Sequence, residues 1–405
     1  MFEKCFENIK EKYDCLRELF SDISTVDLDE DVVDNEKVLM LMPWETCNLK
    51  CKYCYETYKS NDVMDIELAK SLINNAFSDL GNEEILKIEI RGGEPLVRFD
   101  WIKQVCEWIW YNYKQNNYYI YFVTNGTLLN TNIREWIKTN REKLKVVLSL
   151  DGYKNTHNHN RFNSFDMIDL DFFLETWNVV PVICTLTPEC LDNLYEDCMF
   201  FLKNRFRVTV NIVLGYKWST TDIEKCASEL IKVADDLAMK EYPGYINLFG
   251  KLSMHYQKSD NDKRKKIKCK AANNRVLYTP DGNKYPCQLF IPDAFNRNVL
   301  KGVDYIRMMK ECDANPVECS DCFLFFQCQC CPGYAMNSHG TMTYRTQMEC
   351  DITLMRVLVN AYYWIKKAIN KNYLDIDKQV IVKSIEIFDD YCKQELIYGL
   401  LRNTI

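Results

Sequence analysis

The feature that most constrains this chain is a regular alternation of short β-rich runs with helical patterns between residues 38 and 240. Six runs rich in aliphatic and aromatic residues lie at 38–42, 85–90, 118–123, 145–150, 179–186 and 206–214. Amphipathic stretches follow them at 66–80, 100–114, 132–138, 165–175, 193–203 and 221–240. Such alternation favours a parallel sheet, and apolar runs without clean alternation are typical of strands that are buried on both faces. We therefore predict six β/α units.

Six units are fewer than the eight of a complete α/β barrel, so we expect an incomplete barrel. Its open side must be covered by another part of the chain or by substrate. In barrels of parallel strands the reacting groups lie at the carboxyl ends of the strands. A short polar or glycine-containing element follows each of the first four predicted strands. We expect these elements to meet at one mouth of the barrel.

Composition restricts the class of protein and its partners. The 405 residues exceed one ordinary domain, and 47% hydrophobic with 27% charged residues excludes collagenous and disordered chains. A net charge of −7 disfavours a nucleic-acid binder, whose affinity comes from neutralising phosphates. The chain has no run of about 18 uncharged apolar residues, and its N-terminus lacks the basic region of a secretory signal. We predict a cytoplasmic protein with neither membrane nor nucleic acid as partner.

Twenty cysteines are the outlier in this composition. In a reducing compartment they are expected as free thiols or metal ligands and not as disulfides. Three of them, Cys47, Cys51 and Cys54, follow the first predicted strand with C-x3-C-x2-C spacing. The alternative is structural zinc, which prefers four ligands in paired C-x2-C units, and no histidine lies nearby. Sulfur ligands in this spacing favour a [4Fe-4S] cluster with one iron open to a substrate or cofactor.

This triplet, with Tyr53 directly before the third cysteine, resembles the radical S-adenosylmethionine (SAM) superfamily. The resemblance implies that the three cysteines hold a [4Fe-4S] cluster whose open iron binds the amino and carboxylate groups of SAM. It also implies reductive cleavage of SAM to a 5′-deoxyadenosyl radical, which abstracts hydrogen from the substrate, and it places Tyr53 beside the adenine. The expected fold is then the partial (β/α)6 TIM-like barrel of the radical SAM type.

The elements after the next three strands resemble further parts of this family. Gly92-Gly93-Glu94-Pro95 looks like the GGEP element, whose backbone contacts the amino end of SAM. Asn125 after the third strand, and Ser149 and Arg161 at and beyond the fourth, resemble elements near the ribose and carboxylate of SAM. The alternative roles for Ser149 and Arg161 are helix capping and surface ion pairing. Arg91 departs from the family pattern, in which a small or hydroxyl residue commonly precedes the two glycines.

A second group of cysteines resembles the SPASM extension of radical SAM enzymes, in which seven cysteines bind two auxiliary [4Fe-4S] clusters. The cysteines with matching spacing are Cys269, Cys287, Cys319, Cys322, Cys328 and Cys350. The pattern then expects a cysteine where Pro332 stands, and Cys330 or Cys331 would take that place. The alternative for this region is zinc, because C-x2-C units also occur in zinc ribbons.

The resemblance also implies how these cysteines divide between the two clusters. The nearer auxiliary cluster would take Cys269, Cys287 and either Cys330 or Cys331. Its fourth ligand would be Cys312 or the spare cysteine, or else one iron stays open to substrate sulfur. The farther cluster would take Cys319, Cys322, Cys328 and Cys350.

The other segments carry fewer signals. The first twenty residues and residues 352–405 have helical periodicity, the latter with a break near 370–377. The basic cluster 263–268 (KRKKIK) is either a solvated loop or a site for an acidic peptide. The predicted domains are a helical lead (1–37), a radical SAM core (38–240), a linker (241–268), a SPASM domain (269–351) and C-terminal helices (352–405).

SPASM enzymes largely modify peptides or proteins, so the resemblance implies a maturase that forms a thioether, carbon-carbon or ether crosslink in a ribosomally made precursor peptide. The auxiliary clusters suit such an oxidation because a substrate electron needs an acceptor. One alternative is an anaerobic sulfatase maturase, which makes formylglycine and needs an aspartate as base. Another is a non-catalytic, metal-stabilised peptide-binding protein. The implied partners are a precursor peptide or protein, an electron donor of flavodoxin or ferredoxin type, and a separate leader-binding protein if neither the N-terminal helix nor the basic cluster recognises the leader.

Overall fold

The structure is a computed structural model, and it describes most of the chain. The described residues are 14, 18, 35–56, 59–251, 269, 271, 274–292, 299–311, 319, 322, 324, 327–328, 331–370 and 378–402. The predicted N-terminal helix, apart from Asp14 and Glu18, and the basic cluster 263–268 lie outside these residues. Cys312 and Cys330 lie outside them as well.

A nine-stranded sheet in the order β7-β6-β5-β4-β3-β2-β1-β8-β9 forms the centre of the molecule. Its strands are β1 (Glu36–Leu41), β2 (Ile85–Ile90), β3 (Tyr118–Thr124), β4 (Leu144–Ser149), β5 (Val180–Leu186), β6 (Phe206–Ile212), β7 (Tyr245–Ile246), β8 (Arg275–Tyr278) and β9 (Lys284–Tyr285). Neighbouring strands are parallel throughout, except that β8 and β9 are antiparallel. The six predicted strands are confirmed in order, and their ends differ from the prediction by at most two residues.

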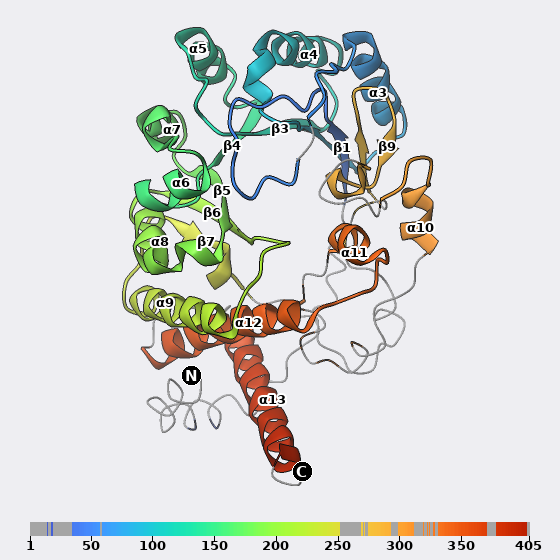
Figure 1. Ribbon diagram of the computed structural model, residues 1–405. Helices are drawn as coiled ribbons and strands as arrows, with labels where there is room; N and C mark the ends of the chain where they lie inside the picture. Colours follow the sequence, from blue (N-terminus) through green and yellow to red (C-terminus); the bar gives the residue numbers. More distant parts are fainter. Residues whose placement is uncertain are drawn as a thin grey trace.

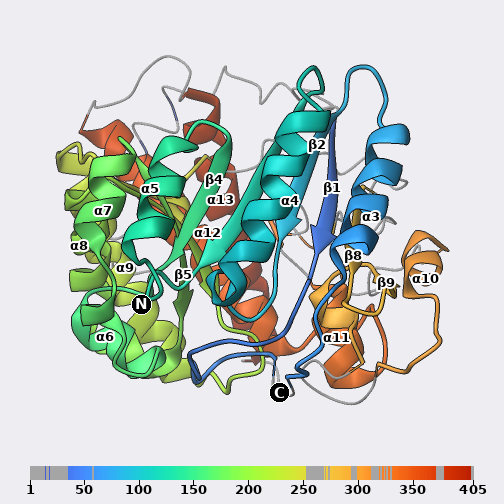
Figure 2. The same ribbon diagram turned by 90° about the horizontal axis from the view of Figure 1, so that it is seen from above.

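Helices cover the outer face of this curved sheet (Figure 1, Figure 2). They are α3 (Ile66–Ser78), α4 (Phe99–Asn112), α5 (Thr131–Thr139), α6 (Lys154–Asn160), α7 (Leu170–Thr176), α8 (Leu194–Lys203) and α9 (Thr220–Met239). Apolar strand residues such as Ile88, Phe122 and Val146 pack in the main core beneath these helices. The prediction of one helix over 165–175 is wrong in part, because a 3-10 turn occupies Phe165–Met167 and α6 precedes it.

The two faces of the sheet differ in polarity, which corrects the prediction that the strands are buried on both faces. β6 alternates buried and exposed residues, and β2 directs Lys87 and Glu89 away from the face that carries Ile88 and Ile90. β1 and β4 come closest to full burial on both sides. In β1, Leu39 and Leu41 lie in the main core and Met40 lies in a smaller core on the other side. The inner face is therefore polar over much of its width.

The cysteine-rich region continues the same sheet, because β8 pairs with β1 along its outer edge. The rest of this region carries α10 (Tyr305–Glu311) and α11 (Pro332–His339). Figure 1 shows α11 and α12 (Gln347–Ile369) along the side that strands β1 to β7 leave open. The predicted cover for the open side is thus supplied by the chain itself.

The C-terminal helices return to the first half of the molecule. α12 packs along α9, and α13 (Lys378–Arg402) packs against α12 (Figure 1). Asn360 of α12 is buried and donates to the carbonyl oxygens of Leu248 at 2.6 Å and Gly250 at 2.9 Å. The two helices lie on either side of the predicted break, but α12 begins five residues before the predicted start and so includes Cys350.

Capping residues explain where these helices begin. Ser219 and Asp222 form a capping box at the start of α9, and Thr346 and Glu349 form one at the start of α12. No helix that the structure describes is both long enough and apolar enough to cross a membrane.

We expect Asn360→Ala to lower the free energy of unfolding by about 1–3 kcal/mol, because the Leu248 carbonyl would lose its donor and the Gly250 carbonyl would keep only the Trp364 indole at 3.2 Å. Urea unfolding followed by circular dichroism under anaerobic conditions measures this change. The exposed Asn132 serves as a control, and Asn132→Ala should leave the unfolding midpoint unchanged. An equal effect of both substitutions would contradict the assignment of Asn360 as the link between α12 and residues 248–250.

Candidate active site

The three thiols of the first cysteine group lie in the loop that follows β1, residues 42–56, which we call the cysteine loop. Cys47, Cys51 and Cys54 are all half-buried. The Leu49 amide donates to Sγ of Cys47 at 3.4 Å, and the Cys54 amide donates to the carbonyl of Cys51 at 3.1 Å. The loop is thus folded back on itself, with its thiols at the carboxyl end of the parallel strands.

The turn Gly92-Gly93-Glu94 after β2 packs directly against the start of this loop. The Glu94 amide donates to the Thr46 carbonyl at 3.0 Å, and the Trp44 indole donates to the Glu94 carbonyl at 3.0 Å. Gly92 has a φ of 142°, which favours glycine. A Cβ at residue 93 would lie 2.3 Å from the carbonyl oxygen of Thr46. The two glycines are therefore required for the close approach of the two backbones.

The Glu94 side chain connects the ends of β2 and β3. Its carboxylate is 1% exposed and accepts hydrogen bonds from the Thr124 hydroxyl at 2.6 Å, the Asn125 amide at 2.8 Å and the Leu96 amide at 3.0 Å. Asn125 in turn donates through Nδ2 to Oδ1 of Asn48, inside the cysteine loop, at 2.9 Å. Glu94 thus holds this corner of the site together, and its own oxygens are occupied by protein donors.

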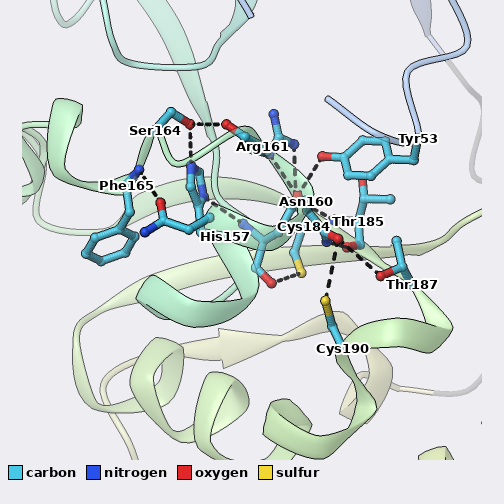
Figure 3. Close-up of polar contacts among 12 residues, drawn as sticks. Tyr53, His157, Asn160, Arg161, Ser164, Phe165, Cys184, Thr185, Thr187 and Cys190 are labelled. Carbon is cyan, nitrogen blue, oxygen red and sulfur yellow. Dashed lines mark hydrogen bonds and ion pairs between the residues drawn. The ribbon is translucent and has the colours of Figure 1, made fainter. Parts of the chain in front are cut away.

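Asp151, directly after β4, organises the other side of the loop. Arg161 donates to its two carboxylate oxygens from Nε at 2.9 Å and from Nη2 at 3.0 Å. The Tyr53 hydroxyl donates to Oδ2 at 2.7 Å, and the Thr185 amide donates to Oδ1 at 2.9 Å. The Arg161 guanidinium also lies 5.4 Å from the centre of the Tyr53 ring (Figure 3). Arg161 is therefore a buried partner of Asp151 and not a surface ion pair.

Helix α6 and its neighbours complete this side of the site (Figure 3). The Asn160 carbonyl accepts from the Lys52 amide at 3.0 Å, and Oδ1 of Asn160 accepts from the Thr187 hydroxyl at 3.2 Å. Burial, and secondarily the Arg161 charge, lowers the pKa of His157 to about 4, so its imidazole is neutral. Its Nδ1 accepts from the Asp151 amide at 3.4 Å, and Nε2 lies 3.1 Å from the Ser164 hydroxyl. His157 therefore supports the position of Asp151.

The chemistry of the three thiols fits an iron-sulfur cluster. Burial raises the pKa of all three and takes that of Cys51 to about 11, so each thiol keeps its proton until a cation replaces it. In the described part of the chain no three Cys, His, Asp or Glu side chains converge closely enough to hold a single metal ion. Three thiols in one loop can serve three corners of a four-iron cluster, whereas a structural zinc ion prefers four ligands.

The second cysteine region separates into two groups of thiols. Cys269, Cys287 and Cys331 are neighbours, and burial together with the other thiols raises the pKa of Cys287 to about 12 and that of Cys331 to about 11. Burial raises the pKa of Cys350 to about 11, and the nearby Cys319 and Cys322 contribute further to this shift. Cys328 lies in the same region, close to Arg356 of α12. This division agrees with the one that the sequence resemblance implies.

The structure brings together the residues that the sequence predicts for the SAM site. Around the cysteine loop lie Tyr53, Gly92, Gly93, Glu94, Asn125 and Arg161. Ser149 is buried at the carboxyl end of β4, two residues before Asp151. Sequence reasoning missed three residues that hold this arrangement, namely Asn48, Asp151 and Asn160. Asp151 had a signal, since it directly follows the fourth predicted strand, but its partners Tyr53 and Arg161 are distant in sequence.

Comparison with known proteins identifies this arrangement. The family model of the radical SAM superfamily matches residues 41–230. The radical SAM cyclopropyl synthase TigE of Paramaledivibacter caminithermalis is 24% identical over 353 residues, which cover 78% of this chain and 72% of TigE. The cysteine-type anaerobic sulfatase-maturating enzyme of Clostridium novyi is 29% identical over 180 residues, which cover 40% of this chain.

The solved structures show the same fold. The structure of native anSMEcpe with bound AdoMet and Kp18Cys peptide matches with a TM-score of 0.64 at 20% identity, over 83% of this chain and 99% of that one. The chain spans about half the length of the Clostridium novyi enzyme (46%) and of the uncharacterized protein MJ0907 of Methanocaldococcus jannaschii (52%), to which it is 33% identical over 153 residues.

Residues 41–230 form a domain of the radical SAM superfamily, and the structure has the partial barrel of that family. Proteins with this domain are radical SAM enzymes, and SAM and [4Fe-4S] clusters are the cofactors of this class. The match to this class argues against the alternative of a non-catalytic, metal-stabilised peptide-binding protein.

We expect Gly93→Ala to lower the iron content of the first cluster, because a methyl group would collide with two carbonyl oxygens of the cysteine loop. Iron and sulfide per chain after anaerobic reconstitution measure this loss. Gly81→Ala is the control, since a methyl group there meets only the flexible side chain of Glu84. Full iron content in the Gly93 variant would show that the loop tolerates displacement from the glycine turn.

Proposed function

We propose that this enzyme is a peptide maturase that uses SAM to begin a radical reaction on a side chain of a precursor peptide. The observation that carries the proposal is the convergence of four elements at the carboxyl ends of β1 to β4. The cysteine loop, the glycine turn and the residues Asn125 and Asp151 are all joined by hydrogen bonds.

In this proposal Cys47, Cys51 and Cys54 hold a [4Fe-4S] cluster, which with bound SAM supplies a 5′-deoxyadenosyl radical on one-electron reduction. The backbone of Gly92 and Gly93 binds the amino end of SAM, and Tyr53 lies beside its adenine. Asn125, Ser149 and Arg161 bind its ribose and carboxylate. Asp151 holds Tyr53 and Arg161 in place through hydrogen bonds of 2.7 to 3.0 Å.

The second cysteine region is proposed to hold two auxiliary [4Fe-4S] clusters. Cys269, Cys287 and Cys331 serve the nearer one, in agreement with their proximity to one another. Cys319, Cys322, Cys328 and Cys350 serve the farther one. Cys330 and Cys312 remain alternatives for a fourth ligand of the nearer cluster. We also propose the domain boundaries that the sequence predicts. The radical SAM core and the SPASM domain then share one sheet, because β8 pairs with β1.

The substrate is proposed to be a ribosomally made peptide in which a thioether, carbon-carbon or ether crosslink is formed. The bound peptide in the anSMEcpe structure supports a peptide substrate. Similarity to the cyclopropyl synthase TigE over 78% of the chain supports the carbon-carbon option, because closing a cyclopropane ring forms a carbon-carbon bond. Electrons are proposed to come from a flavodoxin or ferredoxin, and the leader to be recognised with the help of a separate protein. The cytoplasm is the proposed location.

The second candidate is an anaerobic sulfatase maturase, which the similarity to the Clostridium novyi enzyme and to anSMEcpe favours. The two candidates differ in product, because a crosslink removes two hydrogens and conversion of Cys to formylglycine removes its sulfur. Mass spectrometry after anaerobic turnover distinguishes them, with peptides from a short reading frame beside the gene and with a Cys-containing sulfatase peptide as the two substrates. Loss of sulfur from the sulfatase peptide alone would decide for the second candidate.

We expect Cys47→Ala, Cys51→Ala and Cys54→Ala together to abolish release of 5′-deoxyadenosine from SAM under a strong reductant. The full chain should contain about twelve irons and the triple variant about eight, since each cluster contributes four. Loss of all iron would instead mean that the three clusters depend on one another for folding. Iron in the normal amount without any SAM cleavage by the unmodified chain would contradict the proposed function.

The two groups of auxiliary thiols predict separable losses. We expect Cys287→Ser with Cys331→Ser to remove about four irons, and Cys319→Ser with Cys350→Ser to remove about four others. Electron paramagnetic resonance of the reduced variants should show a different cluster missing in each. As a control, Cys106→Ser changes a buried cysteine of α4 that packs in the main core and should keep all irons. Loss of the same signal from both double variants would contradict the division.

A further inference from the structure

The inner face of the sheet carries more positive than negative side chains. Its cationic residues on the strands, and at the end of β2, are Lys87, Arg91, Lys145, Arg207 and Arg275, and its carboxylates are Glu36 and Glu89. Positive charge therefore exceeds negative charge by three. The carboxyl group of Glu56 in the cysteine loop also lies near Arg91. Counting it as negative still leaves an excess of two positive charges. None of the functions assigned above uses this charge.

The centre of this face is a buried ion cluster around Glu89. The Glu89 side chain is 1% exposed, with Nη2 of Arg91 at 2.5 Å and Nζ of Lys87 at 3.5 Å from its carboxylate oxygens. Nε of Arg91 and Nε of Arg275 are both buried without a hydrogen-bond partner. A buried N–H group without a partner is unfavourable, so two cations here have donors to offer to a further anion.

The cluster extends across the sheet to accessible residues. In the strand register Glu89 pairs with Tyr121, and Tyr121 pairs with Lys145. Nζ of Lys87 lies 3.9 Å from the ring centre of Tyr121. Lys145 is exposed, and its Nζ lies 3.5 Å from the ring centre of Tyr119. A band of cations and tyrosines thus runs from the accessible part of β4 to the buried part of β2.

The band ends at the candidate SAM site. Arg91 directly precedes Gly92 and Gly93, and its charge also acts on Tyr55 of the cysteine loop and on Cys287 of the nearer auxiliary group. An anion held by Arg91 would therefore lie between the two cysteine groups, where the peptide must react if the proposed function holds. This position gives a physical role to the arginine that departs from the pattern at residue 91.

We propose that this inner face binds a carboxylate of the substrate peptide, close to the residue that is modified. The inference rests on the proposed function and deepens it, since it makes the preferred substrate an acidic peptide. The carboxylate comes either from an Asp or Glu side chain or from the C-terminus of the peptide. Charge complementarity selects this partner, because an excess of two or more positive charges in a partly buried site disfavours a basic peptide by like-charge repulsion.

The test measures peptide binding to the full chain, reconstituted anaerobically and loaded with SAM. The probes are fluorescent Gly-Ser peptides that carry four Asp residues or four Asn residues, both with an amidated C-terminus, and a third that carries Asn with a free C-terminus. We expect the Asp peptide to bind roughly tenfold more tightly than the Asn peptide at about 50 mM salt, and the difference to shrink as salt rises. A gain only for the free C-terminus would assign the carboxylate to that source. Equal binding of all three peptides would overturn the proposal.

Matched variants locate the effect. Lys145→Gln should weaken binding of the Asp peptide about threefold to fivefold, as expected for one exposed ion pair. Lys143→Gln should leave binding of the Asp peptide unchanged, because Nζ of Lys143 lies 4.9 Å from the ring centre of Trp110 in α4, on the helix-covered side of the sheet. The same loss in both variants would show a non-specific effect of charge and overturn the proposal.

The buried pair is tested by changing both partners. Glu89→Gln combined with Arg91→Gln removes one charge of each sign, so the net charge of the face is unchanged and the Arg91 donors are lost. The preference for Asp over Asn should then shrink if Arg91 holds the carboxylate. Loss of SAM binding with the preference intact would assign Arg91 to SAM and overturn the proposal. Release of 5′-deoxyadenosine is measured separately. If the chain releases no 5′-deoxyadenosine but still prefers Asp peptides, the proposed function is wrong and the anionic site stands. If it releases 5′-deoxyadenosine but shows no preference for Asp, only the anionic site is rejected.

Discussion

The position of the cysteine loop depends on two buried carboxylates, Glu94 and Asp151. They are 1% and 2% exposed, and a buried carboxylate is tolerated only when hydrogen bonds or ion pairs satisfy it. Glu94 accepts from the end of β3, and Asp151 accepts from Tyr53 in the loop and from Arg161 after α6. Each carboxylate thereby joins strand ends that are far apart in sequence, and the half-buried thiols lie between the two.

The division of the sheet into an apolar outer face and a polar inner face explains why chemistry is confined to one side. Helices cover the outer face, where Ile88, Phe122 and Val146 are buried. The inner face carries Glu89, Tyr121 and Lys145 in one row of the register, together with the cysteine loop at its carboxyl end. A polar face within an incomplete barrel can admit an extended peptide, whereas a barrel filled with apolar side chains could not.

The cysteine-rich region is joined to the core by ordinary secondary structure as well as by its thiols. β8 extends the parallel sheet at β1, and Asn360 of α12 binds the backbone of residues 248–250. The two groups of thiols are thereby brought to the open side of the barrel.

The sequence by itself determined the six β/α units, the helices of the C-terminal segment and the residues of the cysteine groups, because hydrophobic period and cysteine spacing are local properties. It did not reveal the short strands β7 to β9, whose two to four residues carry too weak a pattern. It also missed Asp151 and Asn160, since a buried polar residue is recognised only by partners that folding brings near. The departure at Arg91 could be seen in the sequence, but only the tertiary structure placed it beside Glu89 and facing Tyr55 and Cys287. Pairing of ionic groups across strands depends on register, and register is decided by the packing of the whole sheet.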